Sequence, residues 1–285
     1  ADSYTVFRDG AYVDSGRLAD IDRPRLIEMI VGRALGEEYI KTNAPTSVPG
    51  LEVAGLTAPG KIENVSFTAH KGEILGIYGL MGSGRTEIFN CIFGLDAPSA
   101  GTIRLDGAPI TVKKPADAMA QGLAFVTEDR KQTGLNLIDS VRNNVCLASL
   151  PELSPRFNMD RAGEAAASRE MIERFRIKAA RDTMPVSGLS GGNQQKVVLG
   201  KWFLRNPKVL LLDEPTRGVD VGAKREIYRI ICEFAESGGT VVMISSEIDE
   251  VIGMSDRILV MRQGRPAGIC PREEADAQTL VHLST

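Results

Sequence analysis

One segment constrains the fold of this sequence more than any other: Gly79–Thr86, which reads GLMGSGRT. It matches the phosphate-loop pattern G-x-x-x-x-G-K-[ST], except that Arg85 stands where the pattern has lysine. Residues 73–78 predict an apolar strand before it, and residues 87–93 predict a helix after it, which is the context that the motif requires. In such a loop, glycines let successive backbone N–H groups point into one hollow, and the helix N-terminus adds positive potential.

This context predicts a phosphate site, with an ordinary glycine-rich turn before a helix as the alternative. The hydroxyl of Thr86 would then be a ligand for Mg²⁺. The residues that we expect to contact the phosphates are Gly79, Gly82, Ser83, Gly84, Arg85 and Thr86.

Composition excludes several other classes of protein. A net charge of −3 gives no basic surface for DNA or RNA. The four cysteines are scattered without a C-x-x-C pair, which indicates reduced thiols rather than disulfides or a zinc site. No apolar run approaches the ~18 residues of a membrane span, and no signal peptide is evident. The chain begins at Ala1 without Met, as a processed chain or a fragment would.

Strands alternate with helices along much of the chain, which predicts an α/β fold with a mainly parallel sheet around the phosphate loop. The first strands beyond residue 50 alternate in polarity and predict a small β subdomain. Between residues 130 and 188 the pattern becomes helical and charged, which predicts a helical lobe. The expected strands cover residues 51–53, 64–68, 101–107, 122–126, 209–212 and 240–244, and the expected helices include residues 224–235 and one from residue 247.

The two ends of the chain repeat one plan of strand, turn, returning strand and helix. Gly10 corresponds to Gly264 in the turn, and Leu26 corresponds to Leu280 in the helix, both at a spacing of 254 residues. Repetition at one spacing indicates that residues 1–33 are the tail of an earlier copy of the domain. Two unrelated hairpin and helix units are the alternative. Residues 34–50 have the composition of a linker, and residues 51–285 form the main domain.

Two carboxylates directly follow the apolar strand over residues 209–212. An acidic strand end beside a phosphate loop suits a Mg²⁺ site. We expect Asp213 to hold the metal through water, and Glu214 to orient or deprotonate the attacking water. A solvated acidic strand end is the alternative.

A second anion-binding hollow is predicted at Leu189–Gln195, where Ser190, Gly191 and Gly192 precede a helix. This hollow and the phosphate loop flank different lobes, so one chain cannot easily place both on a single phosphate. The simplest interpretation is that the two hollows bind one nucleotide from opposite sides of a dimer.

Together these motifs resemble the ABC-type ATPases. More narrowly, the match is to the second nucleotide-binding domain of the bacterial importers of ribose, galactose and xylose, and residues 1–33 resemble the end of the first domain. The resemblance covers residues 51–285 and is carried by the segments 79–87, 127–131, 189–196, 213–224 and 244–247. It implies binding of ATP and Mg²⁺ on a P-loop NTPase core. It also implies a nucleotide contact from Glu128.

The resemblance further implies that the signature residues Ser190, Gly191, Gly192 and Gln194 complete the site of the other nucleotide-binding domain. Membrane permease subunits would dock between the core and the helical lobe, near Glu128, at the cytoplasmic face of the bacterial inner membrane. A periplasmic binding protein would deliver the sugar. The other hypotheses are a non-catalytic module that only donates the signature surface, and an ABC protein of translation or DNA repair.

The sequence departs from an active ATPase of this family at several positions. Arg85 replaces lysine, Ser246 stands at the position of the switch histidine, and Glu128 lies in the loop that normally carries a glutamine. Residues 57–61 contain no aromatic ring to stack on adenine. We take Glu214 and Ser246 as the catalytic candidates. Loss of one group that stabilises the transition state costs ~10²–10³ in rate, so this site is expected to bind nucleotide and hydrolyse it poorly.

Overall fold

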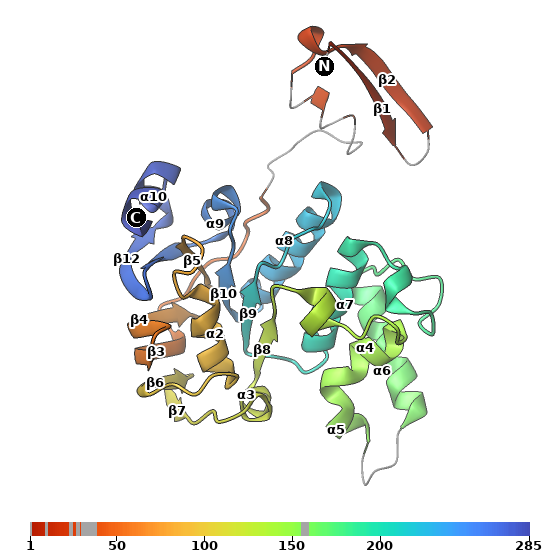
Figure 1. The fold of residues 1–285 in the computed structure, drawn as a ribbon. Coiled ribbons are helices and arrows are strands. Elements are labelled where there is room, and N and C mark those ends of the chain that lie inside the picture. The colour runs from red at the N-terminus through yellow and green to blue at the C-terminus, as the bar shows by residue number, and fades with distance from the viewer. Residues whose placement is uncertain (1, 9–10, 23–24, 27–28, 30–38, 155–159) are drawn as a thin grey trace.

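The computed structural model describes residues 2–8, 11–22, 25–26, 29, 39–154 and 160–285. Its centre is a six-stranded sheet in the order β12-β11-β5-β10-β9-β8 (Figure 1). Neighbouring strands are parallel, except that β12 runs antiparallel to β11. The strands in this order are Arg265–Pro271, Arg257–Arg262, Ile74–Gly79, Thr240–Ile244, Val209–Asp213 and Leu123–Val126.

The sheet is covered on both faces, which explains the unbroken apolar runs of its central strands. Every residue of β5, β9 and β10 is buried. Alternate residues face different layers: Ile77 and Leu259 belong to the main core, whereas Tyr78, Ile258 and Val260 belong to a second cluster. The second cluster is completed by α9 (Ile248–Met254) and α10 (Ala277–Ser284), and α2 (Arg85–Phe93) packs into the main core.

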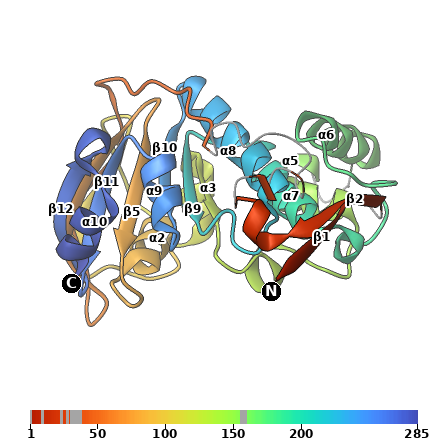
Figure 2. The same cartoon turned by 90° about the horizontal axis from the view of Figure 1, so that it is seen from above.

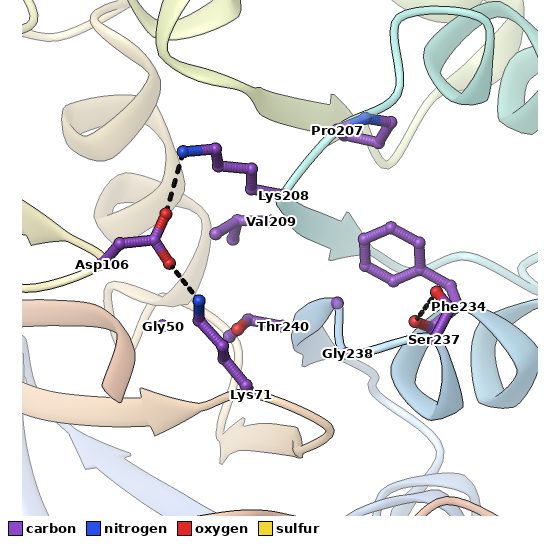
Figure 3. Close-up of a pocket in the computed structure, with 11 residues that line it drawn as sticks. Gly50, Lys71, Asp106, Pro207, Lys208, Val209, Phe234, Ser237, Gly238 and Thr240 are labelled. Carbon is purple, nitrogen blue, oxygen red and sulfur yellow. Dashed lines mark hydrogen bonds and ion pairs between the residues drawn. The ribbon is translucent and has the colours of Figure 1, made fainter. Parts of the chain in front are cut away.

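A separate antiparallel sheet in the order β4-β3-β6-β7 confirms the predicted β subdomain. Its strands are Ile62–His70, Pro49–Ala58, Ala100–Leu105 and Ala108–Ile110. Asp106, in the turn after β6, forms ion pairs with Lys71 at 2.8 Å and with Lys208 at 2.9 Å (Figure 3). Hydrogen bonds from both lysines lower the pKa of Asp106. These contacts tie the small sheet to the start of β9 across a hollow of about 240 Å³.

The predicted helical lobe is also confirmed. It contains α4 (Val141–Cys146), α5 (Leu150–Leu153) and α6 (Arg161–Arg174), which with α7 (Gly191–Phe203) lie beside the sheet (Figures 1 and 2). Side-chain caps specify the helix starts, because Ser140 accepts a hydrogen bond from the Asn143 backbone and Asp160 accepts one from Gly163. Two further helices are α3 (Pro115–Gln121) and α8 (Val221–Glu236).

The two strands of the N-terminal hairpin pair in the same register as β11 and β12. At a spacing of 254 residues, β1 (Ser3–Arg8) corresponds to β11 and β2 (Ala11–Arg17) corresponds to β12. The pairing register is the same, including a bulge after Val6 and a bulge after Val260. Asp22 and Asp276 then accept equivalent hydrogen bonds from the backbone three residues later, at 2.8 and 2.7 Å. Most of the helix predicted after Asp22 lies outside the described residues.

Residues 39–48, the described part of the expected linker before β3, lie against the core. Lys41 forms an ion pair with Asp256 at 2.7 Å, and Asn43 donates hydrogen bonds to Asp256 and to the Gly72 carbonyl. The Tyr39 ring lies 5.4 Å from the Tyr228 ring on α8, measured between centroids. The segment that enters the domain is therefore fixed to α8 and to the loop after α9.

Lys201 on α7 is buried in the main core, where its Nζ donates a hydrogen bond to the Gly134 carbonyl at 2.7 Å. Burial lowers the pKa of Lys201 to about 8 from its ordinary value of 10.5. Between these two pH values the unfolded chain binds more protons than the folded chain, so this residue makes stability rise with pH.

We expect Lys201→Met to remove this contribution. We measure the free energy of unfolding of both proteins in urea at each pH. The difference, wild type minus variant, should increase by about 1–3 kcal/mol between pH 8 and pH 10.5. The same substitution at the exposed Lys178 controls for the loss of a lysine. Parallel curves for wild type and Lys201→Met would contradict the prediction.

Candidate functional site

The strands β5, β10 and β9 are adjacent and parallel, so the loops after their carboxyl ends meet at one edge of the sheet. A hollow of about 300 Å³ lies there. It gathers most of the residues that the sequence predicted for the phosphate and metal site, and Gly79 ends the strand beneath it. Its lining residues are Met81–Glu87, Glu128, Asp213, Glu214, Arg217 and Ser246.

The phosphate loop is built on glycines that other residues could not replace. Gly82 and Gly84 have φ angles of +78° and +93°, in the left-handed region that favours glycine. A Cβ at Gly84 would lie 2.7 Å from Ile62, and one at Gly79 would lie 2.4 Å from the Ser83 hydroxyl. A Cβ at Gly82 would meet no atom within 4 Å. The loop therefore packs tightly against Ile62 at Gly84, whereas there is free space beside Gly82.

Thr86 and Asp213 form the predicted metal pair. The Thr86 hydroxyl donates a hydrogen bond to Asp213 Oδ2 at 2.8 Å. Burial raises the pKa of Asp213 to about 6, against the opposing effects of the Thr86 hydrogen bond and the Arg85 charge. The described residues contain no group of three His, Cys, Asp or Glu side chains that could hold a metal. The two oxygens fit Mg²⁺, which takes few protein ligands and completes its shell with phosphate and water oxygens.

Glu214 and Ser246, the catalytic candidates, are in direct contact. The Ser246 hydroxyl donates to Glu214 Oε2 at 3.0 Å. Burial raises the pKa of Glu214, and the hydrogen bonds from Ser246 oppose this shift. Glu214 has a φ of +51°, so the chain turns sharply where β9 ends. Arg85 donates to the Ser245 carbonyl at 3.1 Å, which connects the phosphate loop to the end of β10.

Arg217 is a residue of this hollow that the sequence analysis missed. Its guanidinium forms an ion pair with Glu128, which follows β8. Arg130 donates to the carbonyls of Arg217 and Gly218 at 2.6 and 3.1 Å and so fixes the main chain below Arg217. A cation three residues after Glu214, in the same loop, was the signal that could have identified it.

The predicted signature residues lie at the start of α7, and none of them lines the hollow at the phosphate loop. Ser190 is exposed and caps the helix by accepting hydrogen bonds from Asn193. A Cβ at Gly191 would lie 2.9 Å from Arg130, and one at Gly192 would lie 2.4 Å from Ala223. Gln194 is 6% exposed and donates to the Leu189 carbonyl. Ser190 and Gly191 thus lie at a surface distinct from the phosphate loop, and Gly192 and Gln194 are buried beneath it.

The two histidines lie away from both surfaces. His70 on β4 contacts Glu73 at 2.8 Å, and His282 is exposed on α10. Neither lines the hollow at the phosphate loop.

Thr86→Val removes the hydroxyl of the metal pair. We expect the gain in ATP affinity that Mg²⁺ provides to fall about tenfold, because one charge-assisted oxygen contact is lost. Affinity in EDTA should stay the same. Isothermal titration calorimetry with and without Mg²⁺ measures both values, and Thr86→Ser, which keeps the hydroxyl, is the control. An equal loss in EDTA would show that Thr86 does not act through the metal.

Comparison with solved structures agrees with this architecture. An ATP-binding cassette of an ABC transporter superposes with a TM-score of 0.71 at 22% identity and covers 84% of this chain and 100% of its own. The cbiO1 protein from Clostridium perfringens, part of the ABC transporter complex cbiONQ, gives a TM-score of 0.67 at 24% identity, covering 82% of this chain and 93% of its own. These likenesses show the fold of an ABC ATPase.

Sequence comparison gives the family. The ribose import ATP-binding protein RbsA of Geobacillus kaustophilus is 44% identical over 284 residues, and a second from Rhizobium meliloti is 44% identical over 284 residues. In the part of the chain that the structure describes, no helix is both long and apolar enough to cross a membrane.

Both matches cover all of this chain, which spans 58% and 56% of the lengths of these relatives. The ABC transporter family model matches residues 62–217. The chain therefore belongs to the ABC transporter family, as an ATP-binding domain homologous to ribose import ATP-binding proteins.

Proposed function

We propose that this chain belongs to the energising subunit of a bacterial monosaccharide importer, where it couples ATP binding and hydrolysis to passage of the sugar through a membrane permease. The observation that carries the proposal is the single hollow that joins the phosphate loop, the Thr86–Asp213 pair and Glu214. The names of the relatives support the sugar class. The subunit would be peripheral at the cytoplasmic face of the inner membrane, with a periplasmic protein delivering the sugar.

One partner would be another nucleotide-binding domain of the same polypeptide. It would precede this domain, and residues 1–33 would be its C-terminal end. The shared register of the two hairpins supports this proposal. Phe7 is 64% exposed, whereas Met261, its counterpart at the same spacing, is fully buried against the sheet. In the proposed preceding domain, a sheet equivalent to the one that contains β11 would cover Phe7.

The site on the phosphate loop of this chain would hold nucleotide and hydrolyse it slowly. Arg85 keeps the positive charge of the usual lysine but is longer, planar and forked, so it changes the phosphate cradle. Ser246 offers Glu214 a neutral hydroxyl where the family pattern has a histidine that can carry charge. No aromatic side chain lines the hollow among the described residues. These features favour a holding site.

The signature surface would act on the nucleotide of the other domain. Ser190, Gly191 and Gly192 offer backbone N–H groups and a helix N-terminus, which suit a phosphate. Gln194 would act from below by fixing the Leu189 carbonyl. A non-catalytic module that only donates this surface is the alternative, and Glu214→Gln in the full-length protein separates the two. A fall in ATPase activity shows that the phosphate-loop site of this chain contributes.

The first test uses the chain alone. We expect it to bind ATP with Mg²⁺ and to turn it over within a few-fold of the Glu214→Gln variant, because the groups that stabilise the transition state are incomplete. Calorimetry gives the affinity, and phosphate release gives the rate. Turnover more than about a hundredfold above Glu214→Gln would contradict a holding site. Absence of ATP binding would contradict the proposed function itself.

The second test uses the full-length protein with its permease. Ser190→Arg places a bulky cation on the signature surface and should lower the ATPase rate about a hundredfold, by blocking the nucleotide of the other domain. ATP affinity of the isolated chain should not change, because Ser190 does not line its hollow. Ser187→Arg, an exposed serine three residues earlier, is the matched control. Unchanged ATPase in Ser190→Arg would refute the role of the signature surface.

A further inference from the structure

The Glu128–Arg217 ion pair lies at the hollow of the phosphate loop, and the proposed mechanism gives Arg217 no role. Both side chains line this hollow, yet they come from loops that follow different strands, β8 and β9. Arg217 is 62% exposed and Glu128 is 46% exposed in their side chains. An ion pair this open to solvent adds little stability, so another partner can replace either residue at small cost.

The charges that face the hollow make such a replacement favourable. Two cations and four carboxylates line it: Arg85, Arg217, Glu87, Glu128, Asp213 and Glu214. A nucleoside triphosphate has several negative charges, and the hollow has more carboxylates than cations. Arg85 donates to the Ser245 carbonyl, and Arg217 is paired with Glu128. If the ion pair with Glu128 breaks, the guanidinium of Arg217 can bind a terminal phosphate in the hollow.

The main chain below Arg217 is fixed while its side chain is exposed. Arg130 donates to the carbonyls of Arg217 and Gly218, and the Val219 amide donates to the Thr216 carbonyl at 3.1 Å. Arg217 can therefore change partner by side-chain rotation, without movement of its loop. A phosphate presents oxygens that match the two-pronged guanidinium and forms stronger hydrogen bonds than a solvated carboxylate pair.

We propose that Arg217 is a phosphate-binding residue of this hollow and that Glu128 holds it away from the nucleotide until a terminal phosphate displaces the carboxylate. This inference rests on the proposed function, because it takes the hollow as a nucleotide site. Glu128 competes with the phosphate for Arg217, so the two residues have opposite effects on binding.

A double-mutant cycle in EDTA tests the proposal without metal. Calorimetric titration of the chain with ATP should show affinity about tenfold weaker in Arg217→Ala, because one charge-assisted phosphate contact is lost, while AMP affinity stays unchanged. Glu128→Gln should strengthen ATP binding several-fold. In the Arg217→Ala background, Glu128→Gln should strengthen ATP binding no more than Glu87→Gln does, because the rest of its effect acts through Arg217. Thermal denaturation of each free variant checks that it is folded.

Two controls separate this contact from the general effect of charge. Glu87→Gln removes another carboxylate that lines the hollow, and its effect on ATP affinity should be the same with and without Arg217. Arg217→Lys keeps the charge without the fork and should restore only part of the affinity.

Three results decide the matter. If Glu128→Gln strengthens ATP binding equally in both backgrounds, Glu128 acts through space and the proposal is overturned. If both single variants weaken binding equally, the pair is only structural and the proposal is also overturned. If the wild-type chain binds no ATP, the proposed function fails and this inference fails with it, whereas ATP binding with an additive cycle contradicts the inference alone.

Discussion

The parallel pairing of β5, β10 and β9 determines where every chemical group of the hollow lies. Ile244 pairs with Ile77 on one side and with Asp213 on the other, so β10 and β9 end level and β5 runs two residues further, to Gly79. This register brings Thr86 to Asp213 across 127 residues of sequence and Arg85 to the Ser245 carbonyl across 160. Because side chains alternate along a strand, a slip of one residue would turn Asp213 away from the loop.

The same arrangement gathers at the hollow two carboxyl groups whose charged forms are disfavoured by burial. Asp213 is 1% exposed, and burial raises its pKa to about 6. Burial also raises the pKa of Glu214, which in addition has a left-handed backbone. A cation with bound phosphate would neutralise these carboxylates, and a ligand that binds only the folded state stabilises it. Under the proposed function, affinity for nucleotide and stability of the fold would therefore depend on the same two carboxylates.

The sequence was sufficient for features that depend on local pattern and insufficient for those that depend on pairs of distant side chains. Apolar runs predicted β5, β9 and β10, and a constant spacing predicted two hairpins that share their register and their bulge. Polar composition suggested a linker at residues 34–50, but composition does not distinguish solvated polar residues from paired ones. Lys41 and Asn43 are paired, with Asp256. The contact of Arg217 with Glu128 spans 89 residues and had no local signal beyond the charge of each residue.

Each of the three residues that we take as departures from the family pattern has a partner at or beside the hollow. Arg85 bonds the Ser245 carbonyl, Ser246 bonds Glu214, and Glu128 pairs with Arg217. Replacement of any one of these residues would therefore break a contact at the hollow. Arg130, which holds the loop of Arg217, also lies 2.9 Å from the point where a Cβ of Gly191 would stand. Arg130 therefore lies between the loop of Arg217 and the start of α7, and a shift of its side chain would reach both.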